Sequence, residues 1–151
     1  MDRAFITQIV SENLKLIRLE NNYTQDKMAE ILGISKKTLV QIEKGRILAN
    51  WTTTIAICAL FHHSKTLQYQ VGGDPMEVTE LTVQDVIITP KEKTMGGHIW
   101  WKNIEEHKKH RLQQNLLSKH FRILDDENYR LISTFDERLA VEKWKDIKAV
   151  L

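Results

Sequence analysis

The sequence has one cysteine, no long apolar run and almost no net charge, and each shortage excludes a class of protein. Cys58 has no second cysteine to pair with, and its place in the apolar run IAICALF indicates a buried, inert thiol. A membrane-spanning helix needs about 20 consecutive apolar residues, which the chain lacks. The start MDRAFITQIVSEN interrupts its apolar residues with Asp2 and Glu12, so we expect no signal peptide. These features predict a protein of the reducing cytoplasm without a membrane segment.

Several signatures of enzymes and cofactor-binding proteins are also missing. The sequence contains no nucleophile elbow, phosphate-binding loop or dinucleotide fingerprint. Its histidines include the adjacent His62 and His63 and the group His107, His110 and His120. Without a second cysteine or a His-Glu-x-x-His helix, we expect these histidines to be surface or hydrogen-bonding residues rather than metal ligands. We therefore expect neither an enzyme nor a cofactor or metal site.

The charge is distributed unevenly along the chain. Residues 1–70 contain nine Lys/Arg and six Asp/Glu, a balance of +3, and the remainder contains thirteen and fourteen. The change coincides with VGGDP (Val71–Pro75), which ends any preceding helix and reads as a hinge. Apolar spacing is helical before this point, and short β-branched and aromatic runs follow it. We predict an α+β protein with one domain at residues 1–71 and a second at 76–151.

Residues 24–45, TQDKMAEILGISKKTLVQIEKG, read as two short helices that meet at a glycine. Thr24 and Ser35 are good N-cap residues for the two helices. Gly33 can adopt a positive φ and end the first helix tightly. Two helices joined by a short turn containing glycine form a helix-turn-helix unit.

The second of these helices separates an apolar side from a polar one. Leu39 and Ile42 lie on one side and can be buried. At about 100° per residue, the opposite arc carries Lys36, Val40, Lys44, Lys37 and Gln41. A face of this size with Lys and Gln side chains suits the major groove of DNA, although charge alone would favour a solvated surface helix. The glycine turn and the caps at fixed offsets favour DNA binding.

Residues 10–61 resemble the helix-turn-helix domain of the phage repressor and Cro type, also called the xenobiotic-response-element type. The similarity runs through Thr24, Gln25, Ala29, Gly33, Ser35, Thr38, Ile42, Glu43 and Gly45. The resemblance implies a compact five-helix domain of a bacterial regulator. It also implies a homodimer that reads a palindromic operator in double-stranded DNA.

The same resemblance assigns roles to individual residues. The residues that would contact DNA are Lys36, Lys37, Val40 and Gln41 at base edges, and Gln25, Thr38 and Lys44 at phosphates. Gln25 would also brace the recognition helix, and Val40 would meet a thymine methyl. Arg18 and Glu43 would form a structural salt bridge between the first and third helices.

The sequence departs from the family pattern in two places. The family usually has glutamine or arginine where Lys37 stands, which leaves the preferred bases open. The family often has a proline soon after Gly45, whereas RILANWTTT follows here. We expect Trp51 to anchor the start of the fourth helix instead.

The C-terminal part is predicted to be an antiparallel meander followed by a helix. The strands are expected at Ile99–Glu105, His110–Asn115, Phe121–Leu124 and Tyr129–Thr134. The final helix would begin at the N-cap Asp136 and bury one face that includes Trp144. An alternative makes residues 104–119 helical on propensity.

Trp100 and Trp101 would point to opposite faces of a strand, so at least one needs a second surface to cover it. The candidates are the protein core, a subunit interface or a small-molecule pocket.

These observations predict a sequence-specific transcriptional regulator, a repressor, whose C-terminal domain dimerises it. The alternative is a ligand- or partner-sensing regulator, including the antitoxin type, whose C-terminal domain modulates DNA binding. An enzyme with an ancillary DNA-binding domain is disfavoured because the sequence offers no catalytic constellation.

Overall fold

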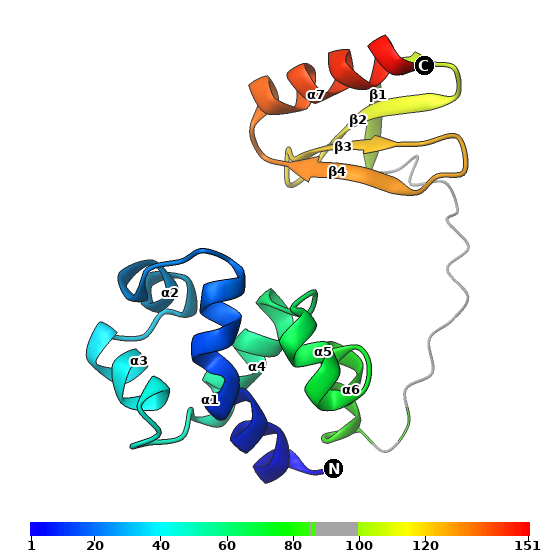
Figure 1. Cartoon of the computed structure of the whole chain (residues 1–151). Coiled ribbons are helices and arrows are strands. Elements are labelled where there is room, and N and C mark those ends of the chain that lie inside the picture. The colour runs from blue at the N-terminus through cyan, green and yellow to red at the C-terminus, as the bar shows by residue number, and fades with distance from the viewer. Residues whose placement is uncertain (85, 87–99) are drawn as a thin grey trace. The chain divides into compact units, whose positions relative to one another are not determined.

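The computed structural model describes residues 1–84, 86 and 100–151 (Figure 1). The helices in these residues are α1 Arg3–Glu20, α2 Gln25–Leu32, α3 Lys36–Glu43, α4 Trp51–Leu60, α5 Lys65–Val71, α6 Pro75–Leu81 and α7 Glu137–Val150. The strands are β1 Trp101–His107, β2 His110–Asn115, β3 Phe121–Leu124 and β4 Arg130–Thr134. The chain divides into two compact units, Met1–Ile88 and Thr89–Leu151. The α+β class predicted from the sequence is confirmed.

The helices of the first unit begin and end at residues with the appropriate local chemistry. Thr24 Oγ1 accepts a hydrogen bond from the Lys27 N–H at 3.1 Å, and Ser35 Oγ accepts one from the Thr38 N–H at 3.0 Å. Gly33 ends α2 with a φ of +67°, in the left-handed region that favours glycine. These local signals set the lengths of α2 and α3 before any tertiary packing is considered.

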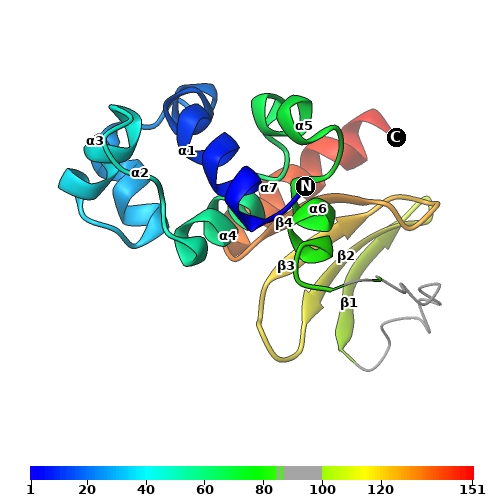
Figure 2. The same cartoon turned by 90° about the horizontal axis from the view of Figure 1, so that it is seen from below.

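The core of the first unit forms around α1, which contacts α3, α4 and α5 (Figure 2). Its buried members include Ile6, Val10, Leu14 and Ile17 from α1, Leu39 and Ile42 from α3, Ile57 and Cys58 from α4, and Leu67 from α5. Burial raises the pKa of the Cys58 thiol, because the thiolate would lose its hydration. The thiol is therefore a packed, unreactive group in the folded protein.

A second link joins the end of α1 to the start of α5. The Glu20 carboxylate accepts hydrogen bonds from the Ser64 hydroxyl at 2.5 Å and from the Thr66 N–H at 2.9 Å. Burial would raise the pKa of Glu20, but the bonds from Ser64 and Thr66 outweigh it and lower that pKa. An acidic side chain thus satisfies one orphan N–H, that of Thr66, in the first turn of a helix that lies far away in sequence.

The described part of the first unit has six helices, one more than the five that the family resemblance implies. Gly72 ends α5 with a φ of +76°, Asp74 then N-caps α6, and Pro75 occupies the first turn, where its missing N–H costs nothing. Because α6 packs against α4 and α5 and buries Pro75 and Thr79, the unit continues beyond residue 71. VGGDP is a turn between two helices of one unit rather than a hinge between domains.

The second unit contains a four-stranded antiparallel sheet in the order β1-β2-β3-β4. The meander is the predicted one, and β2 and β3 have the predicted bounds. Within the described residues β1 begins at Trp101 and continues to His107, while the predicted start, Ile99, lies outside them. The helical alternative for residues 104–119 is wrong, because Lys108 and Lys109 both adopt positive φ and form the turn of a hairpin.

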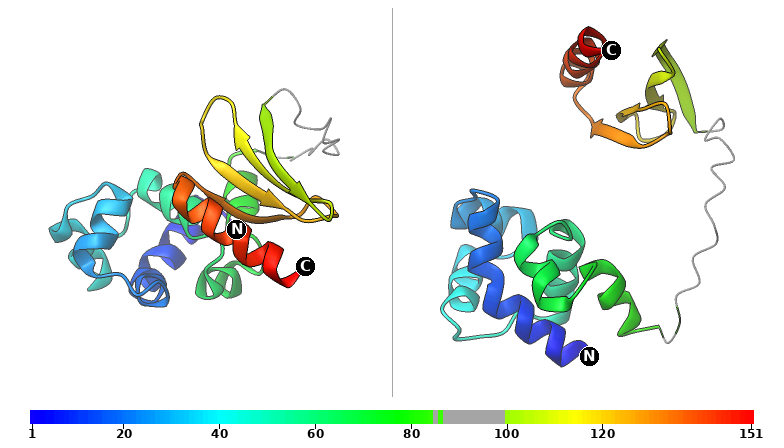
Figure 3. Two further views of the ribbon diagram at one scale, coloured as in Figure 1. Left: turned by 90° about the horizontal axis from the view of Figure 1, so that it is seen from above. Right: turned by 45° about the vertical axis from the view of Figure 1, so that its right-hand side comes forward.

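One face of this sheet is covered by α7, which contacts β3 and β4 (Figure 3). The shared core consists of Leu112, Phe121, Ile123, Ala140 and Trp144, with Ile132 and Ile147 packed beside it. Asp136 N-caps α7 as predicted, accepting from the N–H groups of Arg138 and Leu139. Trp144 is 1% exposed and is the largest buried side chain of this core, so it contributes most of the apolar area that holds the helix to the sheet.

Candidate nucleic-acid interface

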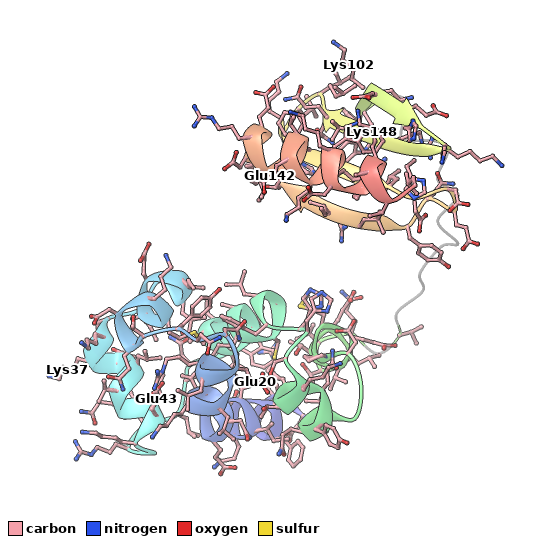
Figure 4. All side chains as sticks on the ribbon, turned by 45° about the horizontal axis from the view of Figure 1, so that its top comes forward. Glu20, Lys37, Glu43, Lys102, Glu142 and Lys148 are labelled. Carbon is pink, nitrogen blue, oxygen red and sulfur yellow. The ribbon has the colours of Figure 1, made fainter. Side chains whose placement is uncertain are left out.

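The outward side of α3 is the candidate surface of the first unit. Leu39 and Ile42 are buried in the core on the opposite side of the helix, so the residues on the remaining side of α3 face away from the core. Lys36, Lys37 and Lys44 are exposed. Figure 4 shows Lys37 extending away from the body of the unit. The helix therefore presents a basic face on a rigidly packed base.

Val40 and Gln41 lie between these lysines and are partly exposed. Together they add an apolar contact and an amide with both donor and acceptor atoms. This combination can meet a base methyl group and a base edge respectively.

Lys36 is not a free cation in this structure. Its Nζ lies 2.8 Å from Asp26 Oδ2, and both side chains are more than half exposed. A surface pair of this kind is weak, since solvent screens the attraction. Lys36 can thus exchange Asp26 for another acceptor at little cost, and in this structure Asp26 holds the lysine beside α2. Sequence reasoning missed this pair, because residues 26 and 36 are brought together only by the turn at Gly33.

Arg18 and Glu43 lie in direct contact and connect α1 with the end of α3. Arg18 Nε donates to Glu43 Oε1 at 2.6 Å, and Arg18 Nη2 donates to Glu43 Oε2 at 3.2 Å. Arg18 Nη1 also donates to the Tyr23 carbonyl oxygen at 3.0 Å. The side chains are 10% and 4% exposed, so this two-pronged pair is shielded from water.

Gln25 completes the arrangement from the start of α2. Its Nε2 donates to Glu43 Oε2 at 2.9 Å. Three helices thus converge on one carboxylate. Burial alone would raise the pKa of Glu43, but hydrogen bonds from Arg18 and Gln25, with the nearby positive charges of Arg18 and Lys15, lower it. Glu43 is therefore ionised at neutral pH and fixes the pose of α3.

Gln25 and Thr38 have the remaining polar groups of the predicted phosphate contacts. The Gln25 amide has two N–H donors, of which one is committed to Glu43, so the other can face a phosphate. The Thr38 hydroxyl lies 2.8 Å from Ser35 Oγ at the start of α3. Gln25 can therefore brace the helix with one N–H and offer the other to a second acceptor, whereas the Thr38 hydroxyl is shared with the cap.

The predicted surface around Trp100 and Trp101 belongs to the other unit. Trp100 is 51% exposed, and Trp101 is partly buried. The Arg122 guanidinium carbon lies 3.7 Å from the centre of the Trp101 ring, and His120 meets that ring edge-on at 4.8 Å.

In the described residues no helix is long and apolar enough to cross a membrane, and no three His, Cys, Asp or Glu side chains gather as a metal site would require.

The comparison with known families agrees with the geometry of the first unit. A family model described as a helix-turn-helix domain matches residues 11–70, which include α2 and α3 and the Gly33 turn between them. No curated protein and no solved structure matches the chain. The N-terminal unit therefore contains a helix-turn-helix domain, the type of domain that DNA-binding regulators use.

Proposed function

We propose that the protein is a sequence-specific transcriptional repressor that binds a palindromic operator as a homodimer and reads each half-site with α3. The observation that supports this proposal is the fixed pose of α3. The C-terminal end of α3 is held by the bonds of Glu43 to Arg18 and Gln25. The lysines on the outward side of the helix are exposed. The protein acts by binding rather than by catalysis.

The chemistry of the outward side chains fits direct reading of bases. Lys37 can donate to guanine O6 and N7, Gln41 can pair with adenine N6 and N7, and Val40 can contact a thymine methyl. Lys44 and Gln25 are suited to phosphates, which fix the register of the helix in the groove. Lys36 would leave Asp26 and join the base contacts when DNA approaches.

A second candidate is a ligand- or partner-sensing regulator, of which an antitoxin would be one type. It is supported by the second unit, which has a hydrophobic core of its own and is therefore suited to a separate binding task. In that case the C-terminal unit would modulate operator affinity rather than only dimerise the protein.

The test begins with selection of operator sequences from random double-stranded DNA by the full-length protein. We expect a shared motif with two-fold symmetry and a protein dimer on each site by analytical ultracentrifugation. Lys37→Ala and Gln41→Ala should each cost about 1–3 kcal/mol on the selected site. Lys27→Ala is the matched control, because Lys27 is an exposed lysine of α2 that pairs with Glu30. Equal losses for Lys37→Ala and Lys27→Ala would contradict the assignment of the reading face.

A further inference from the structure

The sheet face opposite α7 carries an ordered row of polar side chains. The register aligns Asn103, Gln113, Arg122 and Ser133 across the four strands. Gln113 Nε2 donates to Asn103 Oδ1 at 2.6 Å, and Arg122 Nε donates to Gln113 Oε1 at 2.8 Å. Gln113 is 7% exposed, so the centre of this row is packed, while Asn103 and Ser133 at its ends are exposed. The Arg122 guanidinium is thereby held in one orientation.

Three aromatic rings follow one another at one end of the same face. Trp101 lies against Arg122, His120 meets Trp101 edge-on, and the His120 and Phe135 ring centres are 5.7 Å apart. Phe135 is 77% exposed. A large aromatic ring in water at the end of a stacked row offers a surface on which a flat ligand group can stack.

Three arginines come from three adjacent strands of this face: Arg111 on β2, Arg122 on β3 and Arg130 on β4. Arg111 and Arg130 both align with Leu124 of the strand between them, so they are about 10 Å apart. None of the ion pairs among the described residues includes any of the three. Burial, with the positive charges of Arg111 and Arg130, lowers the pKa of Arg122. Glu106 aligns with Arg111 across β1 and β2 and places one negative charge on this face, and Arg111 also donates to Asn128 Oδ1. Three arginines against this one aligned carboxylate leave an excess of positive charge on the cluster.

We propose that this arginine-aromatic face, formed by Trp101, Arg111, His120, Arg122, Arg130 and Phe135, binds single-stranded nucleic acid. Positive charges spread over three strands match a chain of repeated phosphates better than a single small anion. The exposed ring of Phe135 provides a platform for a base, and base stacking on aromatic side chains tolerates any sequence.

Charge also argues against the other occupants of an uncovered sheet face. A second copy of the chain packed face to face would oppose three arginines with three arginines. In a double helix the bases are already stacked on one another, so the ring of Phe135 would gain no partner. An acidic peptide would satisfy the arginines but would leave the aromatic row unused.

The experiment measures the binding of full-length protein to fluorescein-labelled 20-nucleotide strands of deoxythymidine and of uridine by fluorescence anisotropy. We expect Arg111→Gln with Arg130→Gln to weaken binding at least about tenfold, because two phosphate contacts are lost. Phe135→Ala should weaken it at least about fivefold through lost stacking. The two strands distinguish DNA from RNA as the natural ligand, since both share phosphate and base chemistry.

The matched control is Arg138→Gln with Lys145→Gln, which removes two exposed positive charges from α7 on the other side of the sheet. It should change binding less than about twofold, because salt screens distant charges. The α3 variant Lys37→Ala with Gln41→Ala should retain single-strand binding while losing operator binding, so this proposal and the proposed function can fail separately.

Four results would overturn the proposal. They are no binding by the unaltered protein, equal weakening by the two charge-removing pairs, loss of single-strand binding in the α3 variant, and competition by polyglutamate as effective as by unlabelled strand. Thermal melts of each variant, followed by circular dichroism, establish that the compared proteins are folded.

Discussion

Removal of the Glu43 side chain should destabilise the first unit through the charge that it leaves behind. In Glu43→Ala the Arg18 guanidinium, 8% exposed as a residue, would keep its bond to the Tyr23 carbonyl but lose both bonds to the carboxylate. Breaking a shielded ion pair by removing one partner costs about 3–5 kcal/mol. Because the end of helix α3 can shift and admit water, we expect a loss of about 2–4 kcal/mol in the free energy of unfolding.

The double change Arg18→Met with Glu43→Leu removes both charges and keeps the volume, so it should recover most of that stability. Recovery will be incomplete, since Gln25 Nε2 loses its acceptor and must turn to water. Urea melts of the original protein, both single variants and the double variant form a double-mutant cycle. Additivity of the single effects would refute the reasoning, because residues in a shielded pair must be energetically coupled.

The pH dependence of stability provides a second test of the interaction between Arg18 and Glu43. The pKa of Glu43 is lowered in the folded state, so its contribution is present above the unfolded value near 4.5 and is lost as the pH falls through the folded pKa. In Arg18→Met the main cause of that lowering disappears and burial remains, which raises the pKa of Glu43. That variant should therefore lose less stability, relative to the original protein, at pH 5 than at pH 7.5. An equal loss at both pH values would show that Glu43 does not depend on Arg18.

Three further predictions concern DNA binding and the two units. Lys44→Ala should weaken binding to operator and to random DNA alike and reduce the salt dependence of log K by about one unit. Lys37→Ala should weaken binding to the operator alone, and filter binding at several salt concentrations compares the two variants. A fragment that ends at Gln84 should remain folded and helical by circular dichroism because it retains α6, and it should bind operator more weakly if the second unit supplies the dimer; unchanged affinity would remove that role. Trp144→Ala should cost the second unit about 3–5 kcal/mol and leave the melting of the first unit unchanged, which calorimetry can resolve as two transitions.

Much of the helix-turn-helix geometry could be predicted because its signals are local. Thr24, Gly33 and Ser35 act on their own neighbours within three residues, so the bounds of α2 and α3 follow from sequence. The turn at Lys108 and Lys109 could not be recognised in the same way, since it uses positive φ at two residues that are not glycine. Local propensity then left a helix as an alternative for that segment.

The parts that escaped prediction depend on long-range register. The contact of Trp101 with Arg122 requires three strands in a defined alignment, and β1 shifts its register between Asn103 and Glu105. No spacing in the sequence reveals such a shift. Helix α6 was missed for a different reason, because seven residues are too few for a clear apolar period.

The row of Asn103, Gln113 and Arg122 on the sheet, with the buried Gln113 amide at its centre, also affects which misfolded forms this chain can adopt. A strand pairing displaced by one residue would turn Gln113 towards Trp144 and expel Leu112 into water, because side chains alternate between faces. The exposure of Leu112 to water alone makes that displaced pairing only moderately unfavourable in free energy. The loss of the bonds from Gln113 to Asn103 and from Arg122 to Gln113 adds a further penalty, since an amide buried without partners is costly. The amide and guanidinium groups thus protect this short four-stranded sheet against out-of-register pairing, to which its small hydrophobic core is a weaker barrier. They also oppose the aggregation that begins from such pairing.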